Sequence, residues 1–195
     1  MTRVAILWHM HQPFYQDLVT GEHILPWVRL HGLKDYYGIV ALLREFPTVK
    51  VTFNLVPSML VQLEAFARGE ARDRHLDIGL KPAEALTEDE RAFAIEHFFH
   101  AHRPRMIDPY PRYADLFAKR GLNGGVSPRI QAAQFSVAEI RDLQVWHKLV
   151  WLDPFYLERD PRVGELLAKG RDFTEEDKAT LRAVELEILQ RVIPE

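Results

Sequence analysis

The expected fold is decided by an N-terminal segment that reads Val4-Ala5-Ile6-Leu7-Trp8-His9-Met10-His11-Gln12-Pro13. Val4–Leu7 is a continuous apolar run with β-branched residues, which is typical of a strand buried on both faces of a parallel sheet. A polar cluster and Pro13 follow directly. We therefore predict a buried strand over 4–7, with the residues from Trp8 to Pro13 at its carboxyl end.

The next elements complete a βαβα order. Apolar residues at helical spacing predict a helix over 30–46 that Pro47 ends. Lys50–Leu55 predicts a second strand, and Ser58 is expected to cap a helix over 59–66. This order predicts parallel strands joined by a right-handed crossover. Functional side chains in such sheets lie just past the carboxyl ends of the strands.

The remainder of the chain reads as mostly helical. The charged stretch 67–86 predicts an exposed connection that can include a short helix, whereas Thr87, Ser136 and Thr174 each begin an expected helix. The fold class is therefore α/β, with two parallel strands followed by several helices; residues 1–66 form the βαβα part and 67–195 a mostly helical insertion. Two strands cannot close a barrel and leave an unpaired edge, so we expect an incomplete sheet that is prone to aggregate.

Composition excludes several classes of protein. The net charge is −3, with 25 basic residues interspersed among 28 acidic ones, so no basic face is expected to follow a nucleic acid. The absence of cysteine excludes disulfides, thiolate nucleophiles and cysteine-based zinc sites. The apolar run near the N-terminus is too short for a signal peptide, and no run approaches 18 apolar residues. We expect a cytoplasmic protein with no membrane span.

His9 and His11 are the first candidate functional residues. Residues two apart in a strand point to the same side, so the two imidazoles are expected to lie together. The aromatic residues around them favour sugar binding, since sugars have flat C–H faces that stack on rings and hydroxyls that need directional partners. Two alternatives stay open: the pair binds a metal, although no third ligand stands at a recognised spacing, or it satisfies backbone groups at a strand end.

A second cluster lies between the first strand and the first helix. Trp27 is placed to stack on a sugar, and His31 and Asp35 are one helical turn apart. Asp35 is equally explained as part of a charge pair at a helix start. Asn54, at the end of the second strand, is either a polar contact in a pocket or a turn former.

These residues resemble a known family. The segment Trp8–Tyr15 resembles the first signature of glycoside hydrolase family 57, a His-Gln-Pro motif at the end of the first barrel strand. The resemblance continues, in order, through 25–37, 52–58, 142–146, 151–154 and 170–178. It implies an incomplete (β/α)7 barrel and activity on α-glucans, as in amylases, pullulanases, 4-α-glucanotransferases and branching enzymes. It also implies a retaining mechanism with a Glu nucleophile and an Asp acid/base.

The resemblance implies roles for particular positions. His9 and His11 would hold sugar hydroxyls beside the nucleophile, in a substrate site with Gln12, Trp27, His31, Asp35 and Asn54. No cofactor or metal is implied, and the partner is an α-glucan or oligosaccharide.

The two catalytic carboxylates are expected beyond Glu195, so we assign neither to this chain. We expect no glycosidase activity without the C-terminal part of the enzyme. The alternatives are a non-catalytic carbohydrate-binding remnant and a metal-dependent hydrolase that uses His9 and His11.

Overall fold

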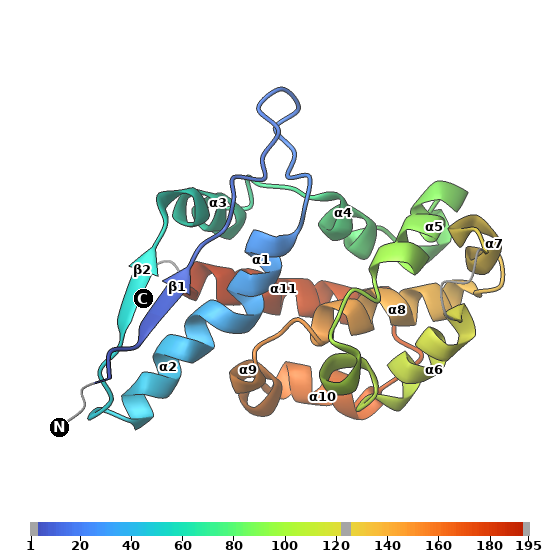
Figure 1. Ribbon diagram of the computed structural model, residues 1–195. Coiled ribbons are helices and arrows are strands. Elements are labelled where there is room, and N and C mark those ends of the chain that lie inside the picture. Colours follow the sequence, from blue (N-terminus) through green and yellow to red (C-terminus); the bar gives the residue numbers. More distant parts are fainter. Residues whose placement is uncertain (1–3, 122–125, 193–195) are drawn as a thin grey trace. The chain divides into compact units, whose positions relative to one another are not determined.

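The computed structural model describes residues 4–121 and 126–192 and has a mixed α/β fold, largely helical, with two parallel strands (Figure 1). The elements discussed below are β1 (Leu7–Met10), α1 (Trp27–His31), the π-helical turn η1 (Gly32–Tyr36), α2 (Tyr37–Glu45), β2 (Thr52–Leu55), α3 (Pro57–Ala67), α4 (Arg74–Leu80), α5 (Glu88–His97), α6 (Pro111–Arg120), α7 (Pro128–Ala132), α8 (Val137–Leu149), α9 (Pro154–Arg159), α10 (Pro161–Lys169) and α11 (Glu175–Val192). None of the described helices has the length and apolar character needed to cross a bilayer.

The chain divides into two compact units. The first contains Met1–Arg74, Asp153–Phe155 and Glu185–Glu195, and the second contains His75–Leu152 and Tyr156–Val184. Segments far apart in the sequence therefore build the first unit, which holds both strands and all the residues singled out above for sugar binding.

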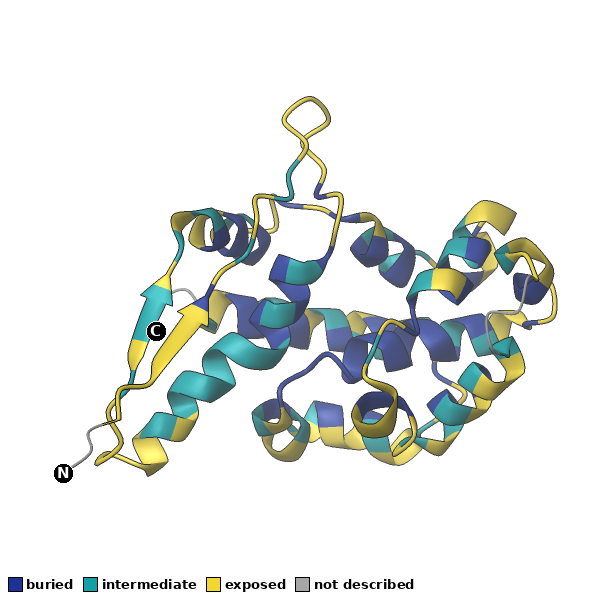
Figure 2. Ribbon diagram, viewed as in Figure 1, coloured by how far each residue is buried: buried dark blue, intermediate teal, exposed yellow. Residues whose placement is uncertain are grey.

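The two strands are parallel, as predicted, but the first strand is not where the apolar run placed it. β1 pairs with β2 in the register Leu7 with Thr52 and Met10 with Leu55. Val4 lies before β1, and the exposed fractions of Val4 and Leu7 are 82% and 63% (Figure 2). The prediction of a strand over 4–7 buried on both faces was wrong. An apolar run favours a strand, but its burial depends on partners that the run does not specify.

The predicted helix over 30–46 is instead three segments. α1 passes into η1, and α2 then ends before Pro47. The backbone N–H of Asp153 donates to the carbonyl of Leu33 (3.1 Å), inside the π-helical turn. Gly38 lies directly against the Asp153 carboxylate, because a Cβ at this position would be 1.9 Å from Oδ2. Asp153, more than a hundred positions away in the sequence, thus contacts the helix where its backbone changes to the π-helical form. Helical spacing does not predict this change.

The start of α3 differs from the prediction. Pro57 occupies the first helical turn, Val56 is the N-cap, and no side chain caps the helix. A proline at this position loses no helical hydrogen bond and already has a helical φ. The proposal of Ser58 as the cap was wrong: its hydroxyl donates instead to the carbonyl of Gln12 (2.8 Å).

The stretch 67–86 is not an exposed connection. It contains α4, in which Leu76 and Ile78 are buried, and it carries the buried Asp73. Asp73 accepts two hydrogen bonds from Arg29 of α1, which is itself buried. Charges in the sequence suggested exposure, but one of them is neutralised inside the first unit by a partner 44 residues away.

The second unit follows its local signals closely. Thr87 and Ser136 form complete capping boxes at the starts of α5 and α8, as expected from the residues three positions later. Thr174 accepts from the backbone N–H of Asp177 before α11. Trp146 and Trp151 are buried in its core.

Candidate functional site

A cavity of about 330 Å³ lies at the carboxyl end of β1. It brings together five of the seven residues that the sequence singled out for sugar binding. Its lining consists of Trp8, His9, Met10, His11, Gln12, His31, Asp35, Tyr36 and Ile39. β1 and the segment after it supply one wall, and α1, η1 and α2 supply the other.

His9 of β1 and His11, directly after β1, lie side by side in this cavity. The ring centroids of His9 and His11 are 5.6 Å apart and the ring planes differ by only 6°. Both residues are exposed. We expected the two imidazoles to lie on the same side because the residues are two positions apart, and this expectation is confirmed. The pair presents two polar, flat rings to whatever enters the cavity.

His31 and Asp35 are also joined, as their spacing suggested. Nδ1 of His31 lies 2.6 Å from Oδ2 of Asp35, and the side chains are 35% and 40% exposed. His31 ends α1 and Asp35 lies in η1, so the contact spans the junction between the α-helix and the π-helical turn. π-helical turns are frequent at functional sites. A carboxylate bonded to one ring nitrogen fixes how the imidazole is oriented.

Gln12 is held by two tyrosines. Its Nε2 donates to the hydroxyl of Tyr36 (3.1 Å), and its Oε1 accepts from the hydroxyl of Tyr15 (3.1 Å). Burial raises the pKa of both tyrosines, so both hydroxyls are protonated at neutral pH. The amide therefore lies in the cavity in a fixed orientation.

Trp27 and Asn54 lie beside the cavity but do not line it. The indole of Trp27 is 6.4 Å from the ring of His31, centroid to centroid. Asn54 pairs with His9 across the two strands, and its buried Oδ1 has no hydrogen-bond partner within the described part of the chain. Both residues therefore neighbour a histidine of the cavity.

One protein-family model matches most of the chain. The model of glycosyl hydrolase family 57 matches residues 5–184. The chain belongs to glycosyl hydrolase family 57. No curated protein and no solved structure gave a match.

Membership of family 57 gives the site its chemical context. The family consists of enzymes that act on glycosidic bonds, so the substrate is a carbohydrate. The cavity combines ring faces with imidazole, amide and carboxylate groups. Sugar recognition needs this combination of stacking surfaces and directional polar partners.

A metal site at His9 and His11 would need further ligands. Among the residues that the structure describes, no group of three His, Asp or Glu side chains is close enough to hold an ion. In the described ranges, no third His, Asp or Glu side chain therefore joins His9 and His11 in such a group.

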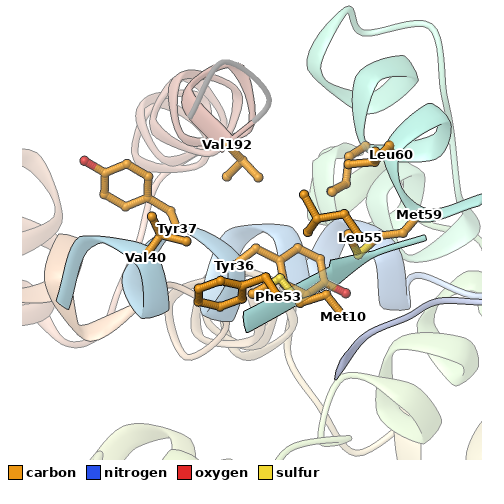
Figure 3. Close-up of a pocket in the computed structure, with 10 residues that line it drawn as sticks. Met10, Tyr36, Tyr37, Val40, Phe53, Leu55, Met59, Leu60 and Val192 are labelled. Atoms are coloured by element: carbon orange, nitrogen blue, oxygen red, sulfur yellow. The ribbon is translucent and has the colours of Figure 1, made fainter. Parts of the chain in front are cut away.

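A second cavity of the family 57 chain, of about 260 Å³, is almost wholly apolar (Figure 3). β1 and β2 contribute Met10, Phe53 and Leu55, and the helices contribute Tyr36, Tyr37, Val40, Met59, Leu60, Leu63 and Val192. Tyr36 and Met10 line both cavities. The Tyr36 ring contributes to the apolar cavity while its hydroxyl contacts Gln12.

Sequence reasoning missed the residues that support the site. Tyr36 counts in the sequence only as one of the positions of the helix predicted over 30–46, although its hydroxyl holds Gln12. Gln62, on the buried side of α3, belongs to none of the motifs found in the sequence. A polar residue at a buried helical position is a usable signal, but only after the buried face of that helix is known.

Proposed function

We propose that the cavity at the end of β1 is the sugar-binding site of a retaining enzyme that acts on α-glucans. On this proposal, the chain forms the first part of an incomplete (β/α)7 barrel, with 67–195 as a helical insertion, in a cytoplasmic enzyme. The observation that carries the proposal is the gathering of His9, His11, Gln12, His31 and Asp35 around one cavity in a family 57 chain.

Each side chain has a role that its chemistry supports. The parallel imidazoles of His9 and His11 donate to and accept from neighbouring hydroxyls of one sugar ring. The His31–Asp35 pair supplies a second polar contact, because its carboxylate orients the imidazole. Trp27 offers an aromatic face, and the unpartnered Oδ1 of Asn54 accepts from a hydroxyl.

The catalytic carboxylates are proposed to come from sequence beyond this chain. A retaining glycosidase needs two carboxyl groups about 5 Å apart. Asp35 is the only acid among the described residues that line the cavity, and it is bonded to His31. One carboxyl group cannot supply the pair that retention needs, and the described lining residues offer no second one. The chain then binds sugar but does not cleave it.

Calorimetric titration of the chain with maltoheptaose tests the binding site. We expect His11→Ala to weaken binding about tenfold, the effect of losing one or two hydrogen bonds to a ligand. His102→Ala is the matched control, since His102 is exposed and lines neither cavity. Unchanged affinity in His11→Ala, or no binding by the wild-type chain, would refute the proposal.

Turnover is tested on a chain extended with its downstream coding sequence. We expect hydrolysis or glucanotransfer on starch, pullulan or maltooligosaccharides, with retention of the anomeric configuration. Binding without turnover in the extended protein would favour the alternative of a non-catalytic carbohydrate-binding protein. Zinc that remains at one equivalent after dialysis, and that is lost in His9→Ala, would favour a metal-dependent hydrolase.

A further inference from the structure

Gln62 is the most heavily bonded polar side chain next to the site, yet it does not line the cavity. It lies on α3 and is 2% exposed. Its Oε1 accepts from the backbone N–H of Tyr15 (2.9 Å), and its Nε2 donates to the carbonyls of Pro13 (2.9 Å) and Ser58. Both amide hydrogens and one oxygen lone pair are therefore used.

Two of these contacts fix the segment that follows β1. Pro13 and Tyr15 lie 49 and 47 residues from Gln62 in sequence, so their contacts are tertiary. Ser58, one turn earlier on α3, donates to the carbonyl of Gln12 (2.8 Å). α3 thus holds three of the four residues that follow His11 by their backbone groups. A buried amide with these partners costs free energy if any partner is withdrawn, so the segment is held in one conformation.

We infer that Gln62 is a positioning residue: together with Ser58 it holds the backbone of Gln12, Pro13 and Tyr15, and so it sets the placement of His11 and Gln12 for sugar binding. This inference rests on the proposed sugar site. The Tyr15 hydroxyl donates to Oε1 of Gln12, so a shift of the Tyr15 backbone moves a partner of Gln12 as well. Hydrogen bonds weaken steeply when their distance and angle depart from the ideal, so displaced side chains bind sugar hydroxyls less tightly.

Gln62→Met tests the inference because methionine keeps the length of the side chain and removes all three hydrogen bonds. We expect maltoheptaose affinity to fall about tenfold when measured well below the melting temperature of the variant. The matched control is Gln144→Met in the second unit. Gln144 is also fully buried and donates to two backbone carbonyls, those of Ile78 and Lys81. This control should lower the melting temperature and leave the affinity unchanged.

A second readout does not depend on sugar. Ring-current shifts make the imidazole proton resonances of stacked His9 and His11 sensitive to their mutual placement. We expect these resonances to move in Gln62→Met and not in Gln144→Met. If Gln62→Met does not fold, Ser58→Ala replaces it, since it removes only the contact with Gln12 and should weaken affinity severalfold with little change in melting temperature.

The outcomes separate the two proposals. A wild-type chain that does not bind maltoheptaose refutes the sugar site, whereas the histidine resonances still decide whether Gln62 places His11. A folded Gln62→Met, or Ser58→Ala in its place, that binds as tightly as wild type overturns the positioning role. Unmoved histidine resonances in that variant overturn it too. Equal loss of affinity in Gln144→Met would mean that stability alone sets the effect, and would likewise overturn it.

Discussion

Removing one charge from the buried Arg29–Asp73 pair should destabilise the first unit severely. Nε of Arg29 donates to Oδ2 of Asp73 (2.7 Å) and a terminal nitrogen donates to Oδ1 (3.1 Å). The side chains are 2% and 0% exposed. Asp73→Asn keeps the shape of the side chain but removes the carboxylate that faces the buried Arg29 guanidinium.

The expected loss is large relative to the stability of a domain. Removing one partner of a buried ion pair costs about 3–5 kcal/mol, because an uncompensated charge remains in a region of low dielectric constant. Typical domains are stable by only about 5–15 kcal/mol. Replacing both partners by apolar residues of similar size is often neutral. The double variant Arg29→Met with Asp73→Leu should therefore recover most of what Asp73→Asn loses.

Urea unfolding followed by tryptophan fluorescence and circular dichroism measures these losses. Trp27 lies in the first unit, whereas Trp146 and Trp151 lie in the second, so fluorescence and circular dichroism transitions that do not coincide would show that the units unfold separately. A loss below about 1 kcal/mol in Asp73→Asn would show that the pair is solvated rather than buried. A double variant as unstable as the single one would show that packing, not charge, is responsible.

Three further outcomes follow from contacts in the structure. Gly38→Ala should lose about 1–3 kcal/mol in urea unfolding, because its Cβ would meet the Asp153 carboxylate, whereas Gly164→Ala, with open space around its Cβ, should gain up to about 1 kcal/mol. Burial lowers the pKa of His23, so the unfolded chain binds a proton that the folded chain excludes; stability should fall as pH drops below about 6.5, and His23→Phe should flatten this dependence in urea unfolding. Ser136→Ala should cost about 1 kcal/mol in the same assay, since it removes the N-cap of α8, and no change would contradict the capping box.

Much of the candidate site was predictable because it depends on spacing along the chain. Residues two apart in a strand share a side, which placed His9 beside His11. Residues four apart on helical backbone meet, which joined His31 to Asp35. The π-helical turn between α1 and α2 does not prevent the contact between His31 and Asp35. The spacing of apolar residues did not predict the turn itself.

The sequence by itself determined the parallel strand pair, the capped helix starts of the second unit, the family and the gathering of imidazoles at the end of β1. These features depend on covalent spacing and on short-range hydrogen bonds, which act in any context. Only the tertiary structure decided that Leu7 is exposed, that Asp73 is buried and that Gln62 holds the segment after His11. Burial and long-range hydrogen bonds depend on partners tens of residues away, and the local sequence pattern around a residue does not identify those partners.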